Sequence, residues 1–180
     1  LFEPGTAHMR KAQDGYGDRF LGDTADVITL RLAQNTAPYN IVYTLNNVGL
    51  PTNGICTVNL PAGSTSSYFL VINHRNSIET WSSFPVSLSA NHTTYNFTNG
   101  AQKAYGYNLF LMNGNWVIFG GDLTQDGIVD SSDLTYVDAD ASVFATGYLD
   151  SDANGDGIID SSDFTIVGNN TSQFVGSVRP

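Results

Sequence analysis

The segment 122–133 reads DLTQDGIVDSSD, and it recurs 30 residues later as DANGDGIIDSSD at positions 152–163. The similarity extends beyond these twelve residues, because Leu134, Val137, Ser142 and Phe144 recur as Phe164, Val167, Ser172 and Phe174. The C-terminal part of the chain is therefore a duplicated unit, and the two acidic segments are its signature.

The spacing of oxygen-bearing side chains in each copy is typical of a calcium loop. Oxygen ligands stand at positions 1, 3, 5, 9 and 12, a glycine at position 6 permits a sharp turn, and residue 7 offers its backbone carbonyl. Two such loops in tandem predict two Ca²⁺ sites. The predicted ligands are Asp122, Thr124, Asp126, Ile128, Asp130 and Asp133 in loop one, and Asp152, Asn154, Asp156, Ile158, Asp160 and Asp163 in loop two.

The charge distribution supports this interpretation. The 180 residues carry a formal charge of −10, and residues 1–121 are balanced, with six acidic and six basic side chains. Residues 122–180 hold eleven Asp against Arg179 alone, and such a density opposes compaction unless cations offset it. The acidity therefore indicates ligand supply for calcium, and it argues against nucleic acid as a partner.

Other composition features indicate a secreted protein. The single cysteine, Cys56, excludes an intrachain disulfide, and the alternating run Gly54–Leu60 around it predicts a small buried side chain. The sequence shows neither a membrane span nor a signal peptide, and its start at Leu1 suggests processing from a precursor. We expect an extracellular, cell-surface protein that uses metal where others use cystine.

Residues before the loops have the period of two that is typical of strands, with Ile28, Leu30 and Leu32 on one face and Ile41, Tyr43 and Leu45 on another. Asn113-Gly114 between apolar segments predicts a hairpin. The predicted strands are Val27–Leu32, Asn40–Leu45, Ile55–Leu60, Tyr68–His74, Ile78–Trp81, Val86–Leu88, Thr94–Thr98, Leu109–Met112 and Trp116–Phe119.

Many short strands with regular turns indicate a mainly β fold, an antiparallel, immunoglobulin-like β-sandwich over residues 1–119. Helical spacing appears only after each loop, and it predicts one short amphipathic helix each time within a second domain, 120–180. The expected apolar positions are Leu134, Val137, Ala141 and Phe144, and then Phe164, Val167, Thr171 and Phe174.

With both loops identified, residues 120–176 resemble a type I dockerin, a tandem of calcium loops that lack the entering helix of an EF-hand. Aspartate at position 12, as at Asp133 and Asp163, is also dockerin-like. Position 3 of loop one departs from the family, because Thr124 stands where Asn or Asp is usual. Cohesin-binding dockerins carry paired recognition residues at loop positions 10 and 11, here Ser131-Ser132 and Ser161-Ser162, so the resemblance leaves a cohesin-like partner open without identifying one.

The whole chain also resembles C-terminal regions of secreted proteins from Bacteroidota-type bacteria. The similarity rests on the run from His74 to Trp81 and on Lys103-Ala104-Tyr105-Gly106, followed by the calcium loops. In those relatives the sandwich begins with a strand that ends near Leu1–Glu3, which is truncated here. The resemblance implies architecture and secretion, and it carries no activity.

Candidate sites outside the loops are few. His74 and Glu79 could form an acid–base pair, but a structural ion pair between Arg75 and Glu79 is the preferred interpretation. Trp81 and Trp116 are candidates for a glycan-binding surface, although aromatic residues are common in strands anyway. Thr24 is a candidate O-glycan acceptor. Asn91, Asn96, Asn169 and Asn170 satisfy Asn-x-Ser/Thr and are interpreted as turn residues.

These patterns favour a non-enzymatic, extracellular, calcium-stabilised structural module that self-associates as a homo-oligomer or filament. The incomplete first strand at Leu1-Phe2-Glu3 would leave an edge for a neighbour to complete. The alternatives are a glycan-binding accessory module and a dockerin that binds a cohesin-like protein.

Overall fold

The computed structural model describes residues 8–61, 63–64, 66–90 and 92–180. The expectations for Leu1-Phe2-Glu3 and Asn91 lie outside these residues. The strands are β1 (Thr24–Gln34), β2 (Ile41–Pro51), β3 (Ser67–His74), β4 (Ser77–Trp81), β5 (Val86–Ser87), β6 (Phe110–Met112) and β7 (Asn115–Val117), with the 3₁₀ turns η1 (Ala101–Lys103) and η2 (Tyr105–Tyr107) and the helices α1 (Ser131–Ser142) and α2 (Ser161–Ser172).

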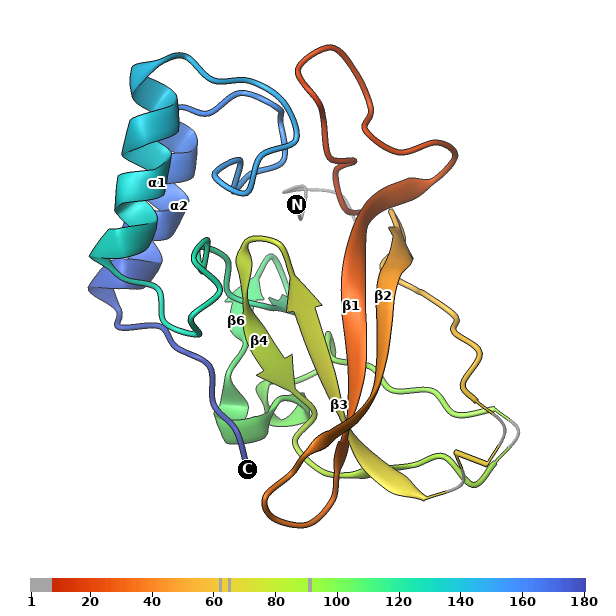
Figure 1. The fold of residues 1–180 in the computed structure, drawn as a ribbon. Coiled ribbons are helices and arrows are strands. Elements are labelled where there is room, and N and C mark those ends of the chain that lie inside the picture. The colour runs from red at the N-terminus through yellow and green to blue at the C-terminus, as the bar shows by residue number, and fades with distance from the viewer. Residues whose placement is uncertain (1–7, 62, 65, 91) are drawn as a thin grey trace.

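The prediction of a mainly β chain with antiparallel sheets and two helices is confirmed. The main sheet has the order β2-β1-β3-β4, β5 also pairs with β3, and β6 and β7 form a separate two-stranded sheet. The helices lie side by side on one flank of the sheet (Figure 1). Within the described residues, no helix combines the length and apolar character needed to cross a bilayer.

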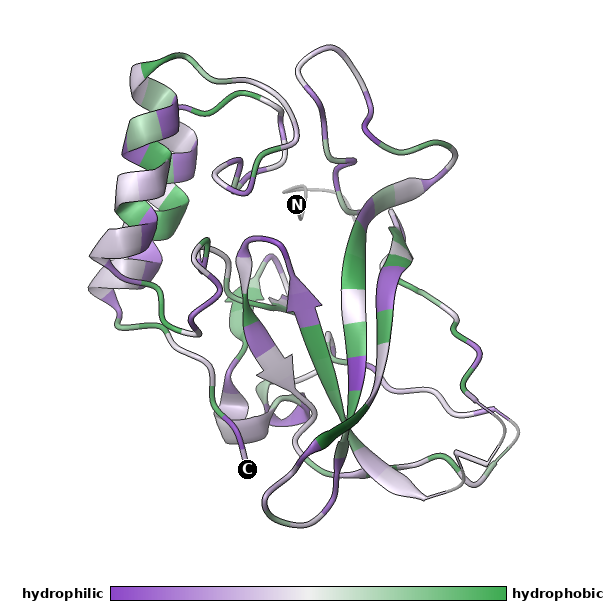
Figure 2. Cartoon of the chain, viewed as in Figure 1, coloured by the Kyte–Doolittle hydropathy of each residue, from purple (hydrophilic) through white to green (hydrophobic). Residues whose placement is uncertain are grey.

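The expected alternation in β1 is confirmed, because Ile28, Leu30 and Leu32 are buried while the residues between them are partly exposed. Figure 2 shows the resulting change between hydrophobic and hydrophilic positions along this strand. The alternation expected in β2 does not bury its apolar residues, and Ile41 is 41 % exposed. The reason is position: β2 is the outer strand of the sheet and pairs with β1 on one side.

Two expected strands are wrong, since residues 55–60 and 94–98 form no ladder. Asparagine side chains turn the backbone locally in both places: the Ile55 amide donates to Asn53 Oδ1 at 2.9 Å, and the Thr98 amide donates to Asn96 Oδ1 at 2.7 Å. Such short-range bonds compete with sheet formation. As a consequence Cys56 is exposed, and its expected burial is also wrong.

The hairpin at Asn113-Gly114 is confirmed between β6 and β7. Both residues have positive φ, 49° and 84°, which is the conformation that a two-residue hairpin turn requires. Strand β7 is followed by a bridge between Ser77 and Gly120, so the chain enters loop one from an extended segment.

Helices α1 and α2 share an apolar core with β4, in which Val137, Val167, Ile78, Leu123 and Val129 are buried. The duplicated units interlock reciprocally. Thr146, after α1, bridges Ile158 of loop two, and Gly176, after α2, bridges Ile128 of loop one. Each loop is therefore completed by backbone from the other unit.

The expected apolar faces of the helices are wrong at three positions, since Phe144, Phe164 and Phe174 are 88 %, 44 % and 91 % exposed. Phe144 and Phe174 follow their helices at positive φ, 54° and 55°, because the chain leaves the helix there in a left-handed conformation that turns the side chain outward.

Candidate metal centre

Each acidic loop ends in a helix whose first turn is built by two of its aspartates. The Asp130 side chain caps α1 while Asp133 reaches back to the Asp130 amide, which forms a capping box. Asp160 and Asp163 repeat this arrangement at α2. The Asp-Ser-Ser-Asp sequence therefore ends each loop and begins each helix.

Four loop carboxylates are buried. Asp122 is 2 % exposed and Asp133, Asp152 and Asp163 are fully covered. Backbone amides supply their hydrogen bonds: Asp126 and Gly127 donate to Asp122, both at 3.1 Å. In loop two the corresponding amides of Asp156 and Gly157 donate to Asp152, at 3.1 and 3.0 Å. The loops are thus folded around their position-1 carboxylates in the same way.

The position-12 carboxylates organise the other side of each loop. Asp133 Oδ1 accepts from the amides of Leu123 and Thr124, at 2.8 and 2.9 Å. Asp163 Oδ1 accepts from the Asn154 amide at 3.0 Å. Negative charge is therefore concentrated on the inner side of each turn.

Burial makes this concentration of charge unfavourable. Desolvation, followed by the charge of Asp133, raises the pKa of Asp122 to about 6. Desolvation likewise raises the pKa of Asp152 and of Asp163. By contrast, hydrogen bonds from Ser132 and Ser162 lower the pKa of the surface carboxyls Asp130 and Asp160. The buried carboxyls are the ones that a bound cation would stabilise in their charged form.

Thr124, the unusual residue at position 3 of loop one, has a buried polar atom that is not hydrogen-bonded to any described residue. Its Oγ1 is buried and lacks a hydrogen-bond partner within the described part of the chain. A buried hydroxyl without a partner is unfavourable. A cation in the loop would provide one.

The glycines at position 6 allow both a left-handed backbone conformation and the close packing of another segment against the loop. Gly127 and Gly157 have φ of +91° and +77°, and other segments approach them closely. A Cβ on Gly127 would lie 2.9 Å from Ser177 Oγ, and one on Gly157 would lie 2.8 Å from the Gly15 amide nitrogen. Each loop is therefore covered by a segment distant in sequence.

The described residues contain no group of three or more His, Cys, Asp or Glu side chains arranged so that it could hold a metal ion. Their aspartate oxygens accept bonds from backbone amides, as described above. Calcium loops also use hydroxyl, amide, carbonyl and water oxygens. On chemistry the residues fit, because both loops supply hard oxygen donors, buried charge and, at Thr124, an unpartnered hydroxyl.

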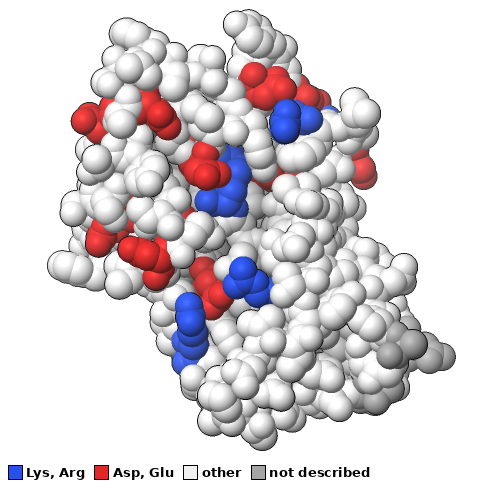
Figure 3. Space-filling model, viewed as in Figure 1, with Lys and Arg blue, Asp and Glu red and all other residues white. Residues whose placement is uncertain are grey.

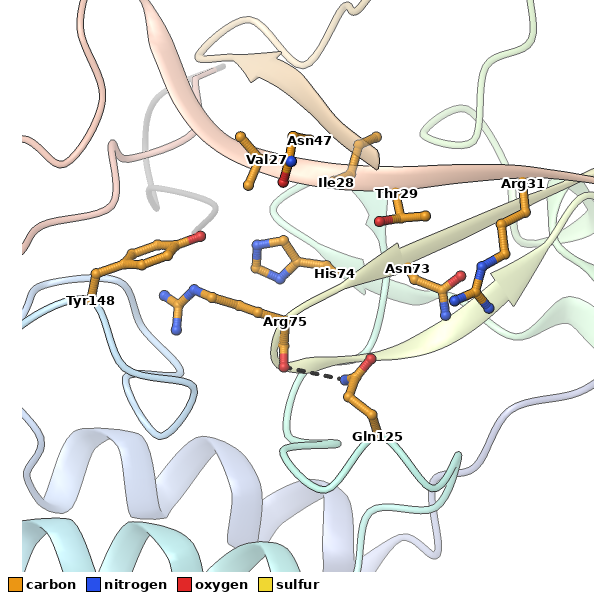
Figure 4. Close-up of a pocket in the computed structure, with 10 residues that line it drawn as sticks. All are labelled: Val27, Ile28, Thr29, Arg31, Asn47, Asn73, His74, Arg75, Gln125 and Tyr148. Carbon is orange, nitrogen blue, oxygen red and sulfur yellow. Dashed lines mark hydrogen bonds between the residues drawn. The ribbon is translucent and has the colours of Figure 1, made fainter. Parts of the chain in front are cut away.

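The expected ion pair between Arg75 and Glu79 is wrong. Arg75 instead crosses to loop two, where it donates to the carbonyls of Leu149 and Asp152 and lies 3.9 Å from the Asp152 carboxylate. Its guanidinium stacks 4.3 Å from the ring centre of Tyr148 (Figure 4). Glu79 pairs with Arg31 and Arg179.

His74 does not pair with Glu79 either. Its Nε2 lies 3.0 Å from the buried Asp26 carboxylate, whose Oδ1 accepts from the Tyr148 hydroxyl at 2.5 Å. Hydrogen bonds from His74, Tyr148 and Val27 lower the pKa of Asp26, although desolvation alone would raise it. This cluster joins β1, β3 and the segment before loop two. The sequence does not predict the pairing of Asp26 with Tyr148, because the two residues are 122 positions apart and belong to no local pattern.

The remaining candidates are dispersed. Ser131, Ser132, Ser161 and Ser162 are exposed at the helix starts, and Thr24 begins β1. Trp81 is 5 % exposed, so it does not offer a flat surface platform. Figure 3 shows acidic residues along the flank formed by α1 and α2, and basic residues where this flank meets the sheet.

Comparisons of the chain with protein-family models, with curated proteins and with solved structures find no match.

Proposed function

We propose that residues 122–133 and 152–163 each bind one Ca²⁺ and that the bound metal has a structural role. The observation that carries the proposal is the burial of four loop carboxylates, of which Asp122 has its pKa raised to about 6. A protein gains little from burying like charges together unless a cation neutralises them. Calcium suits this donor set, since it prefers six to eight oxygen ligands and tolerates irregular geometry.

The side chains that would hold the ion are those at positions 1, 3, 5, 9 and 12, assisted by the carbonyl at position 7. They are Asp122, Thr124, Asp126, Asp130 and Asp133 with the carbonyl of Ile128, and Asp152, Asn154, Asp156, Asp160 and Asp163 with the carbonyl of Ile158. When bound, the metal supplies positive charge that offsets the acidity of the tail, and two ions would cancel four of the ten negative charges.

The proposed structural role follows from what the loops touch. The Gln13 amide donates to the Gly155 carbonyl of loop two at 3.1 Å, and Arg75 and Asn76 bond to Asp152 in the same loop. The Ser177 amide donates to the Gly127 carbonyl of loop one at 2.7 Å. Metal in the loops would thus stabilise their contacts with three segments distant in sequence, those around Gln13, the β3–β4 turn and Ser177. We also propose a location at the cell surface, where even weak sites of roughly 10⁻⁴–10⁻³ M, typical of extracellular calcium modules, would be filled.

Equilibrium dialysis with native mass spectrometry tests the metal proposal. The expected stoichiometry is two Ca²⁺ per chain, falling to one in Asp156→Ala. The proposal fails if the wild-type chain retains no calcium at millimolar concentration.

For the biological role we propose a non-enzymatic assembly module that associates with copies of itself. The support is β2, an eleven-residue outer strand whose Ile41 and Val42 are 41 % and 48 % exposed. An outer strand is a template for backbone pairing with another chain. We also propose that the sheet and the β6–β7 hairpin form a reduced immunoglobulin-like sandwich, a view supported by their antiparallel order.

Sedimentation velocity and negative-stain microscopy in millimolar calcium test the assembly role. Concentration-dependent oligomers or filaments are expected, and Val42→Pro in β2 should reduce them because proline removes a backbone donor. The matched control is Val42→Ala, which changes the side chain at the same exposed position and keeps the backbone donor. Monomers at every concentration would rule the assembly role out.

A dockerin-like role is the second candidate. It is favoured by the exposure of the serine pairs and of Phe144 and Phe174 on the same duplicated unit. Calcium-dependent capture of a cohesin domain, lost on replacing Ser131-Ser132 and Ser161-Ser162 by Asp, is the expected result. Failure of a panel of cohesins to bind would remove this candidate.

A further inference from the structure

A polar cluster on one face of the main sheet is organised around Glu79. The strand register pairs Thr29 with Asn73, Arg31 with Val71, and Val71 with Trp81. Paired residues, and residues two apart in a strand, share a face of the sheet. Arg31, Asn73, Glu79 and Trp81 therefore project from the same face, although they come from three strands.

All of the acceptor capacity of Glu79 is used within this cluster. Its Oε2 accepts from Arg31 Nη1 at 3.3 Å and from Asn73 at 3.4 Å. Its Oε1 accepts from Trp81 Nε1 at 2.6 Å and lies 3.0 Å from Arg179 Nε. A carboxylate has about four acceptor sites. Glu79 consequently holds the two guanidinium groups in place and is not free to receive a ligand.

The cluster has a net positive charge that its own carboxylate does not neutralise. Two arginines face one carboxylate, so these side chains sum to +1 in a chain whose net charge is −10. A guanidinium has five N–H donors, and Glu79 engages Nη1 of Arg31 and Nε of Arg179. The side chains of Arg31 and Arg179 are 36 % and 60 % exposed, so solvent reaches both. A guanidinium binds carboxylates with paired N–H donors.

A cavity of about 400 Å³ opens beside these arginines. Arg31, Glu79 and Arg179 form its charged wall, and Pro38, Tyr39 and Trp81 form an apolar one. The volume is in the range of small-molecule sites. A second cavity, of about 250 Å³, shares Arg31 and is lined by the amide side chains of Asn47, Asn73 and Gln125 (Figure 4). The two cavities have only Arg31 in common, and the larger one, called the groove below, combines anion donors, an apolar wall and the side-chain amide of Asn40.

We propose that this groove binds an acidic saccharide through a carboxylate held by Arg31 and Arg179. A sugar ring has apolar C–H faces that suit Pro38 and Tyr39 with the small exposed part of Trp81, and hydroxyls that suit the Asn40 amide. A peptide carboxylate would use the arginines but would not present ring faces and hydroxyls to Pro38, Tyr39 and Asn40 together, which makes the saccharide the better match. This binding activity goes beyond the structural role proposed above.

Binding is tested by calorimetry and tryptophan fluorescence at saturating calcium, in a Trp116→Phe background that leaves Trp81 as the reporter. The probe is a β-1,4-linked glucuronic acid trimer. Cellotriose, which has the same rings with neutral hydroxymethyl groups, and the tripeptide Ala-Ala-Tyr with a free carboxylate serve as comparisons. The trimer is expected to bind at least about tenfold more tightly than either comparison compound, because charged hydrogen bonds contribute most of the affinity.

Arg31→Gln and Arg179→Gln should each weaken binding of the trimer by about tenfold or more. Arg10→Gln is the matched control, because Arg10 is exposed and lines neither cavity. Circular dichroism verifies folding, and Arg179→Gln alone carries the test if Arg31→Gln does not fold. Equal binding of trimer and cellotriose, tighter binding of the peptide, or indifference to both substitutions would each overturn the proposal. Binding is measured apart from the calcium stoichiometry, so either proposal can fail alone.

Discussion

At the scale of a single residue, Asp122 is a buried carboxylate whose surroundings disfavour its charged form. Its backbone donors, the amides of Asp126 and Gly127, fix its position, while burial and the neighbouring charge of Asp133 raise its pKa to about 6. The fold therefore specifies where the carboxylate lies without providing the positive charge that would make its ionisation favourable.

A pH dependence follows for the metal-free protein. The folded-state pKa of Asp122 exceeds its ordinary value of 3.8, so the stabilisation is present below about pH 4 and is lost as the pH rises to about 6. In EGTA, the free energy of unfolding should fall over this window by on the order of 1–3 kcal/mol. The raised pKa values of Asp152 and Asp163 act in the same direction.

Urea titrations at a series of pH values measure how the free energy of unfolding depends on pH. Asp122→Asn should reduce this dependence, since the amide does not titrate. Asp26 is no confounder, because its lowered pKa has the opposite effect and acts below pH 3.8. An unfolding free energy that rises between pH 4 and 6 in EGTA would contradict the account of the loops.

Gly157 tests the close packing of loop two. Gly157→Ala should destabilise the protein by about 2–4 kcal/mol, because alanine is strained at φ +77° and its Cβ would approach the Gly15 nitrogen to 2.8 Å. Gly54→Ala is the control, with φ +73° and open space around it. The difference between the two melting temperatures isolates the contact, and equal losses would mean that the segment 13–15 is not packed on the loop.

Among the elements, the turn between β3 and β4 contacts loop two through Arg75 and Asn76, and the Asp26–Tyr148 bond links β1 to the segment before that loop. Tyr148→Phe should lower the free energy of unfolding by about 1–3 kcal/mol, because the buried Asp26 loses one donor. Thermal melting of this variant against Tyr136→Phe, at a half-exposed tyrosine of α1, measures the effect. Identical melting of the two variants would show that the bond contributes nothing.

The sequence predicted those elements whose causes are local. The helices and the Asn113-Gly114 hairpin depend on neighbouring residues, and both are present. Segments 55–60 and 94–98 have strand-like composition but form no ladder. Ladder formation needs a partner strand elsewhere in the chain, and the composition of a segment does not reveal one. The partners of Arg75 were missed for the same reason, since Asp152 lies 77 residues away.

At the scale of the whole molecule, the duplicated unit and the sheet share one apolar core through Ile78. Contacts from Gln13, Arg75 and Ser177 converge on the two loops from three parts of the chain. Eight of the eleven aspartates of residues 122–180 belong to these loops, where repulsion between them would weaken the contacts with the three segments. Calcium bound in the loops would strengthen the same contacts.

Thermal melting with and without calcium tests this central claim most directly. Calcium at about 100 times its dissociation constant should stabilise by about 2.7 kcal/mol per site, so two sites should raise the melting temperature by roughly 10–20 °C over EGTA. Asp126→Ala with Asp156→Ala should abolish the rise, whereas Asp150→Ala, which removes a charge outside the ligand positions, should retain it. A wild-type melting temperature that is the same in calcium and in EGTA would contradict the account.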